Sequence, residues 1–221
     1  MCGVIGAFLR DVTQQDLELV EEIYRQSMIR GKHATGVSYI KEKQLVTIKE
    51  PVPVSDFLKT NSVSDWVDET TLLMVGHIRY STSSREHNQP FDNGYVSVVH
   101  NGVISQDPDI WEFETETDND SELLLRAIEA GENPLEYYKD RSMAVVTLHH
   151  DGLMAFRNHE RPLWYAERDN GIIFASTRDI LERSGISEGL HKCEQMVKYS
   201  YRNKLKEDRY LYDPELEDLQ I

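Results

Sequence analysis

Three stretches of the chain carry apolar residues at the spacing of one helix face. In residues 11–31 the apolar stripe begins after Thr13, a predicted N-cap with Asp16 three positions later, and a glycine ends the pattern. Residues 120–131 repeat this arrangement, with an acidic residue or a serine at the start and a glycine at the end. A shorter helix is predicted within residues 55–69. We expect these apolar faces to cover a sheet.

Strand patterns occur along the whole chain. Near-continuous apolar runs, typical of strands buried on both faces, occupy residues 4–9, 71–80 and 95–104. Pairs of strands joined by short turns are predicted at residues 34–52, 143–158 and 163–177, where Asp-Gly and Asn-Gly mark the last two turns. Because helices cluster early while strands recur throughout, the pattern predicts an α+β sandwich of two sheets covered by helices.

Composition limits the protein to a few classes. The 221 residues are 39% hydrophobic and 29% charged, which suits one substantial core. We expect a cytoplasmic protein without membrane contact, since no run approaches ~20 apolar residues and the N-terminus has no signal-peptide pattern. The formal charge of −15 argues against a nucleic-acid partner. We expect no cofactor and no metal, because neither the acidic stretch 107–122 nor the eight histidines have ligand spacing.

The last part of the chain differs from the rest. Residues 185–221 are charged and rich in tyrosine, and we interpret them as an extension that packs on the main domain, residues 1–184, or on a partner. A homo-oligomer is compatible with this composition.

Cys2 raises the first chemical question. A lone cysteine usually acts as a small buried hydrophobe. Removal of Met1, however, would give Cys2 both a thiol and the free α-amine of the chain. An α-amine titrates near ~8 and a thiol near ~8.5, so the amine can accept the thiol proton. The position therefore indicates an N-terminal nucleophile that carries its own base.

Three further sites could complete such chemistry, and each has a structural alternative. Asn101 and Gly102 could donate to one oxyanion, although Asn-Gly is also a strong turn signal. Arg79 closes an apolar run and suits a carboxylate partner. Asp120 stands at a helix start, where it could cap the helix or hold an ammonium group.

Six segments together give these residues a common context. They read "MCGVIGAF", "RGKHATG", "GHIRYST" with "QPF", "VVHNGVI", "DNDSELLL" and "RPLWYAERDNGIIFAST", and they span roughly residues 1 to 180. In this order they resemble the class II glutamine amidotransferases, which are N-terminal nucleophile (Ntn) glutaminases. The "RYST" and "QPF" wording is most similar to the glutaminase half of the amidophosphoribosyltransferases.

The resemblance implies a four-layer αββα sandwich of two antiparallel sheets and a role for each matching residue. Cys2 matches the nucleophile, and Asn101 with Gly102 matches the oxyanion hole. The residues that match substrate-binding positions are Arg79 for the α-carboxylate of glutamine, Asp120 for its α-ammonium, Thr82 beside the carboxylate and Arg30 near the entrance. One departure is His33, which stands where the family usually has an aspartate.

The leading hypothesis is a glutaminase that hydrolyses L-glutamine through a Cys2 thioester and supplies ammonia to a separate synthetase or transferase. No phosphoribosyl-binding segment follows the matching part. Two alternatives remain open. The protein could be an N-terminal cysteine hydrolase of another amide, which would not need the paired anchors Arg79 and Asp120. It could also be a catalytically silent glutamine-sensing subunit, which retention of Met1 would favour.

Overall fold

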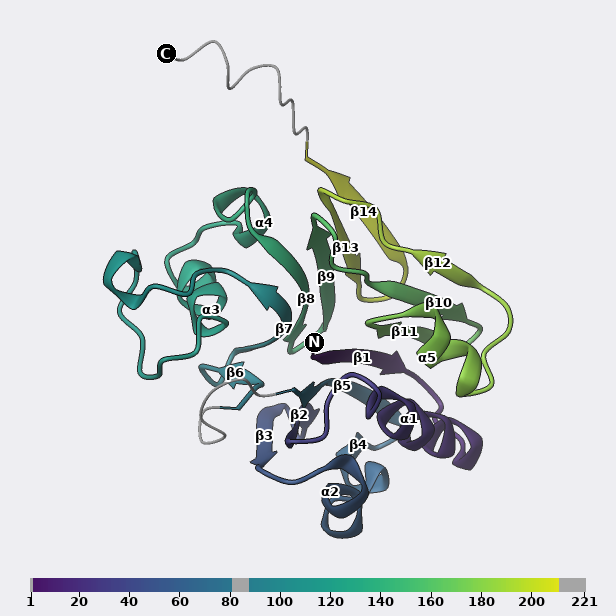
Figure 1. Cartoon of the computed structure of the whole chain (residues 1–221). Coiled ribbons are helices and arrows are strands. Elements are labelled where there is room, and N and C mark those ends of the chain that lie inside the picture. Colours follow the sequence, from purple (N-terminus) through teal and green to yellow (C-terminus); the bar gives the residue numbers. More distant parts are fainter. Residues whose placement is uncertain (1, 81–87, 211–221) are drawn as a thin grey trace.

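Two antiparallel sheets form the centre of the protein in a computed structural model that describes residues 2–80 and 88–210 (Figure 1). Sheet A contains, in spatial order, β12 (Leu190–Lys192), β10 (Trp164–Arg168), β11 (Gly171–Ala175), β1 (Gly3–Leu9), β5 (Thr71–Arg79), β2 (Ala34–Lys41) and β3 (Gln44–Glu50), and β4 (Val67–Asp68) pairs with β5. Sheet B contains β14 (Leu205–Arg209), β13 (Val197–Tyr201), β9 (Gly152–Asn158), β8 (Ser142–His149), β7 (Val96–Val103) and β6 (Phe91–Asp92).

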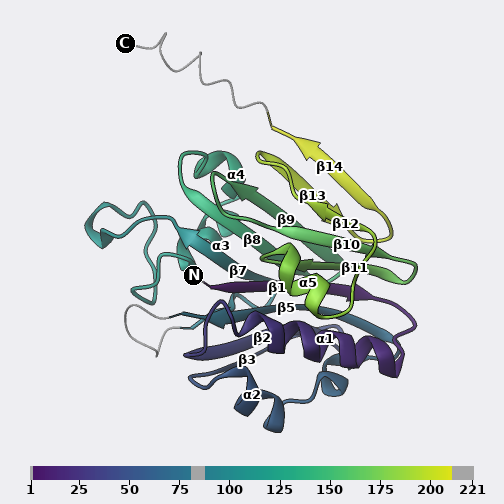
Figure 2. The ribbon, with the colours of Figure 1, turned by 45° about the vertical axis from the view of Figure 1, so that its right-hand side comes forward.

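Helices cover the outer faces of both sheets (Figure 2). Sheet A is covered by α1 (Gln14–Ser27), α2 (Val54–Thr60), α5 (Arg178–Arg183) and the 3₁₀ helix η1 (Val63–Trp66). Sheet B is covered by α3 (Glu122–Glu129) and α4 (Pro134–Tyr137), and the 3₁₀ helix η2 (Pro108–Ile110) precedes them. The order helix, sheet, sheet, helix confirms the predicted four-layer αββα sandwich.

Three hydrophobic clusters fill the three interfaces between these layers. Tyr24 and Trp66 belong to the cluster between sheet A and its helices. Phe8 and Val146 belong to the cluster between the two sheets, and Leu124 belongs to the cluster between sheet B and α3. Residues of β1 alternate between the first two clusters, so this strand is buried on both faces, as its apolar run predicts. The residue before β1, Cys2, is therefore attached to one of the most deeply buried strands.

Local signals in the sequence correctly locate several elements. Thr13 and Asp16 form the predicted capping box at the start of α1. The helix ends at Ser27, earlier than predicted, and Gly31 follows in a turn that brings it against the backbone of Arg79. All three predicted hairpins are present, as β2 with β3, β8 with β9, and β10 with β11.

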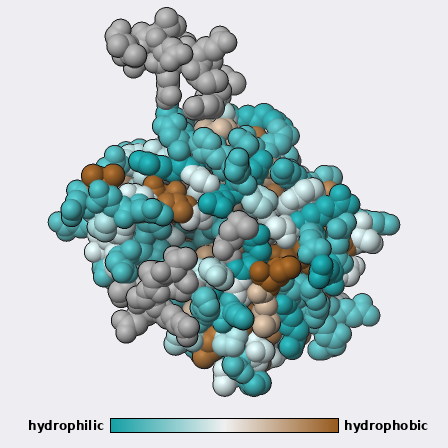
Figure 3. Space-filling model, viewed as in Figure 1, coloured by the Kyte–Doolittle hydropathy of each residue, from teal (hydrophilic) through white to brown (hydrophobic). Residues whose placement is uncertain are grey.

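Residues 185–210 add strands to both sheets. β12 pairs with β10 at the edge of sheet A, and β13 pairs with β9 in sheet B. Tyr199 and Tyr201 are buried in the cluster between the sheets. The visible face of the molecule is largely hydrophilic, with separate hydrophobic patches (Figure 3). Among residues 2–80 and 88–210, no helix has the length and apolar character needed to cross a membrane.

Candidate active site

Cys2 lies where the two sheets bring distant parts of the chain together. Because Gly3 pairs with Ile78 of β5, Cys2 is placed beside the end of β5. The backbone N–H of Cys2 donates to Asn101 Oδ1 at 3.1 Å, and Arg30 Nε donates to the Cys2 carbonyl at 3.4 Å. The residue is thus held from sheet B on one side and from the turn after α1 on the other.

The surroundings of the Cys2 thiol have opposing effects on its pKa. Burial raises the pKa, while the backbone N–H of Tyr80 and the positive charges of Arg79 and Arg30 lower it. Burial is the larger effect, so the pKa of the thiol stays above its ordinary value. A base must therefore take the proton before Cys2 can act as a nucleophile near neutral pH.

Asn101 points a free hydrogen-bond donor away from the Cys2 backbone. A backbone N–H only donates, so the side-chain atom of Asn101 that faces Cys2 must be Oδ1. Its Nδ2 group then lies on the other side, and it is buried without a hydrogen-bond partner among the residues that the structure describes. Buried amide groups are nearly always paired, which makes this donor available to a bound group.

Gly102 lies inside β7 next to Asn101, paired with Met143 of β8, so the alternative that Asn101 and Gly102 form a turn is wrong. A Cβ atom at position 102 would collide with the Ser142 carbonyl oxygen and lie 2.6 Å from His100 Nε2. Only glycine fits where the strands approach this closely.

One cavity of about 300 Å³ gathers four of the residues singled out in the sequence: Cys2, Gly102, Arg79 and Asp120. This volume is at the small end of the range for ligand pockets. The other residues that line it include His77, Gln89, His100, Trp111, Asp118 and Ser121. The four residues come from the start of β1, the end of β7, the end of β5 and the segment before α3, so only the folded chain brings them together.

Arg79 and Asp120 give the cavity one positive and one negative group. Arg79 is only 7% exposed; burial lowers its pKa, and the neighbouring Cys2 and Asp118 raise it. Asp120 accepts from the backbone N–H groups of Ile104 and Ser105 at 2.6 and 3.2 Å through Oδ2. The helix α3 begins after Ser121, so Asp120 fastens the chain after β7 instead of serving as the N-cap.

Comparisons with known proteins agree with this geometry. A family model described as a glutamine amidotransferase domain matches residues 77–183. The chain is 25% identical over 192 residues to glutamine–fructose-6-phosphate aminotransferase (isomerizing) of Sulfurisphaera tokodaii and 26% identical over 219 residues to amidophosphoribosyltransferase of Archaeoglobus fulgidus. These matches cover 78% and 84% of the chain. The family model and these relatives support a class II glutamine amidotransferase domain in this chain.

The fold of this amidotransferase agrees with that of a solved relative. The glutamine phosphoribosylpyrophosphate amidotransferase of B. subtilis superimposes with a TM-score of 0.75 over 96% of the chain at 19% identity. The chain spans 31% and 45% of the two curated relatives and 50% of the B. subtilis chain. The chain therefore matches only part of each of these relatives.

The sequence also singled out Arg30, His33 and Thr82, of which the two described residues, Arg30 and His33, do not line the cavity. Arg30 contacts the Cys2 carbonyl but does not line the cavity. His33 donates its backbone N–H to the Arg79 carbonyl, and its ring lies 5.1 Å from that of Tyr80. Thr82 lies outside the described residues.

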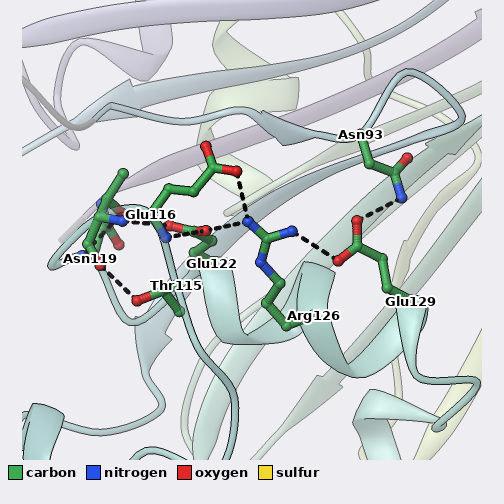
Figure 4. A network of polar contacts seen from close by, with 8 residues as sticks. Asn93, Thr115, Glu116, Asn119, Glu122, Arg126 and Glu129 are labelled. Carbon is green, nitrogen blue, oxygen red and sulfur yellow. Dashed lines mark hydrogen bonds and ion pairs between the residues drawn. The ribbon is translucent and has the colours of Figure 1, made fainter.

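Residues 105–120, which we call the cavity loop, form one side of the amidotransferase cavity. The buried carboxylate of Glu122 holds this loop by accepting from the backbone of Glu116 and from the backbone and hydroxyl of Thr117, at 2.8 to 3.0 Å. Arg126 binds Glu122 at 2.8 Å and also reaches Glu116 and Glu129 (Figure 4). A charged cluster on α3 therefore sets the position of the loop that carries Asp118 and Asp120.

Two buried histidines of the cavity were not singled out in the sequence. Burial lowers the pKa of His77 to about 3 and that of His100 to about 4, so both rings are neutral at neutral pH. The available signal was a histidine inside each of two apolar strands, "LLMVGHIRY" and "YVSVVHNGVI". Among residues 2–80 and 88–210, neither histidine belongs to a group of three or more side chains that could hold a metal ion.

Proposed function

We propose that this domain hydrolyses L-glutamine to glutamate and ammonia through a covalent thioester on Cys2. The observation that carries the proposal is that Cys2, Gly102, Arg79 and Asp120 line one and the same cavity. Asn101 lies beside Cys2, and among the described residues its Nδ2 group has no hydrogen-bond partner. A nucleophile, oxyanion donors and two opposite charges are the groups needed to cleave the side-chain amide of an amino acid.

Arg79 and Asp120 are proposed to bind the two charged ends of glutamine. The guanidinium of Arg79 can donate two parallel hydrogen bonds to the α-carboxylate. The carboxylate of Asp120 is held by the backbone of Ile104 and Ser105 through one oxygen, and it supplies the negative charge that the α-ammonium needs. Arg30, which holds the Cys2 carbonyl, is proposed to position the nucleophile at the cavity entrance.

The reaction begins with removal of Met1, which frees the α-amine of Cys2. This amine takes the thiol proton, and the thiolate attacks the δ-carbon of glutamine. Nδ2 of Asn101 and the N–H of Gly102 stabilise the oxyanion that forms. The amine then gives its proton to the leaving nitrogen, ammonia departs, and a thioester remains. Water activated by the same amine attacks the thioester, which releases glutamate and restores the thiol.

We further propose that a separate acceptor enzyme in the cytoplasm consumes the ammonia. Uncoupled hydrolysis would waste glutamine, so turnover should rise when the acceptor is bound. The exposed apolar side chains Ile29, Tyr80 and Val103 support docking at the cavity, because each is next in sequence to a site residue, namely Arg30, Arg79 or Gly102. Capture of partners on the tagged protein, followed by a glutaminase assay with each partner, tests this proposal.

The central experiment is glutamine hydrolysis by the purified protein and by Cys2→Ala, with intact-mass analysis of both. We expect the wild type to lack Met1 and to release glutamate, and the variant to release none. Equal turnover by the variant would contradict the proposal. Retention of Met1 without turnover would favour a glutamine-sensing subunit. An unchanged KM for glutamine in Arg79→Ala would favour a hydrolase of another amide.

A further inference from the structure

Three buried residues in the wall of the cavity form a closed set of hydrogen bonds. The backbone N–H of His100 lies 2.6 Å from Gln89 Oε1, Gln89 Nε2 lies 2.8 Å from Ser121 Oγ, and Ser121 Oγ lies 2.9 Å from His100 Nδ1. Gln89, His100 and Ser121 are each less than 5% exposed. We call this set the polar ring.

The direction of each hydrogen bond in the polar ring follows from the chemistry of the groups. A backbone N–H only donates, so the Gln89 oxygen must face His100 and the Gln89 nitrogen must face Ser121. The Ser121 oxygen accepts from Gln89, and its own proton is then available for His100 Nδ1. Since burial keeps His100 neutral, its Nδ1 can accept this proton while the ring proton sits on Nε2. Each of the three hydrogen bonds in the ring therefore joins a donor to an acceptor.

The polar ring joins two parts of the proposed site. His100 precedes the oxyanion donor Asn101 in β7, and Ser121 follows the ammonium anchor Asp120. Asp120 itself is bonded to the backbone of Ile104 and Ser105, just after β7. The polar ring adds a second connection between the cavity loop, which carries Asp120, and sheet B, which carries Asn101. A shift of about 1 Å between them would misplace glutamine relative to the oxyanion donors.

We propose that Gln89, His100 and Ser121 are positioning residues that fix the ammonium anchor Asp120 at a set distance from the oxyanion donor Asn101. This inference rests on the proposed glutaminase function. It assigns no contact with glutamine to the ring itself. Removal of one ring member should therefore impair both binding and turnover, although Cys2, Arg79 and Asp120 are not themselves substituted.

The test compares Ser121→Ala with two control variants. Ser121→Ala leaves His100 Nδ1 and Gln89 Nε2 without partners, and we expect KM for glutamine to rise about tenfold and kcat to fall about tenfold. Ser121→Thr keeps the hydroxyl and should restore most of both losses. Ser97→Ala removes a fully buried serine in β7 that donates to Ser38 at 2.8 Å. This control variant should leave KM and kcat unchanged.

A second readout does not depend on turnover. In Ser121→Ala, the side-chain amide signal of Asn101 and the backbone amide signal of Asp120 should both move in NMR spectra of the folded protein, while Ser97→Ala leaves both in place. If both signals stay in place, or if Ser97→Ala loses as much activity as Ser121→Ala, the positioning role is wrong. Absence of glutaminase activity in the wild type would instead contradict the proposed function, and the NMR comparison would still decide the role of the ring.

Discussion

At the scale of single residues, the side-chain oxygen and nitrogen of Asn101 have different surroundings. Oδ1 accepts from the Cys2 backbone at 3.1 Å and so fixes the orientation of the amide. Nδ2 is left buried and unpaired within the described part of the chain, which costs folding free energy unless a ligand oxygen accepts from it. An unsatisfied donor beside the proposed nucleophile Cys2 is an expected feature of a site that stabilises charge only during the reaction.

Substitution of Asn101 should therefore affect the chemical step more than binding. We expect Asn101→Ala to lower kcat for glutamine hydrolysis by about 10²–10³, the usual cost of losing one oxyanion donor, with little change in KM. Steady-state kinetics of the purified variant measure both values. Asn93→Ala, which removes a surface amide bound to Glu129, is the matched control and should retain wild-type kcat. A large rise in KM with normal kcat in Asn101→Ala would assign Asn101 to substrate binding.

At the scale of elements, the cavity is built from rigid strands on one side and a loop on the other. β1, β5 and β7 place Cys2, Arg79 and Asn101 at strand ends that are buried in the sandwich. The cavity loop lacks such support and depends on the buried carboxylate of Glu122 at the start of α3. This carboxylate links the geometry of the site to pH.

The contribution of Glu122 to stability should disappear in acid. Hydrogen bonds from the loop and from Arg126 outweigh burial and lower the pKa of Glu122 below its ordinary value. Because the pKa is lower in the folded state, the stabilisation is fully present above the unfolded pKa of ~4.3 and is lost as the pH falls through the folded pKa. We expect Glu122→Gln to reduce the free energy of unfolding by about 1–3 kcal/mol at pH 7.

Urea denaturation of the wild type and Glu122→Gln at pH 7 and at a pH below the folded pKa measures this difference. At the lower pH the two proteins should have nearly equal stability. Glu182→Gln, which alters an exposed carboxylate paired with Arg178 on α5, is the control and should match the wild type at both values. A pH-independent difference for Glu122→Gln would mean that packing, and not the charge of Glu122, holds the loop.

At the scale of the whole molecule, the segment after residue 184 contributes to both sheets and to the core between them. Cys193, Val197 and Tyr199 are almost fully buried in the inter-sheet cluster. The last strands of sheet B pair with β9 and with one another, so their loss would expose an edge of that sheet and one side of its core.

A chain shortened to residues 1–184 is therefore expected not to fold cooperatively. The physical reason is the loss of apolar burial from several core side chains at once, where removal of a single large one costs about 3–5 kcal/mol. Thermal unfolding followed by circular dichroism should show a cooperative transition for the full chain, a lower Tm for Tyr199→Ala and no transition for the shortened chain. A cooperative transition in residues 1–184 would show that the segment is an independent addition.

The sequence by itself determined the features that depend on local patterns. Apolar runs located the buried strands, and the capping signal at Thr13 located α1, since caps and turns are formed by residues a few positions apart. The order of six motifs indicated the class II glutamine amidotransferases and singled out Cys2, Asn101, Gly102, Arg79 and Asp120 as candidates.

Only the tertiary structure decided how these candidates are arranged. Asn101 and Gly102 form part of a strand instead of a turn because β8 lies beside them. Asp120 bonds to the chain after β7, and the polar ring joins Gln89, His100 and Ser121 across separations of 11 to 32 residues. Asn101 meets Cys2 across 99 residues. Such contacts leave no periodic signal in the sequence, because each depends on which strands become neighbours when the two sheets pack.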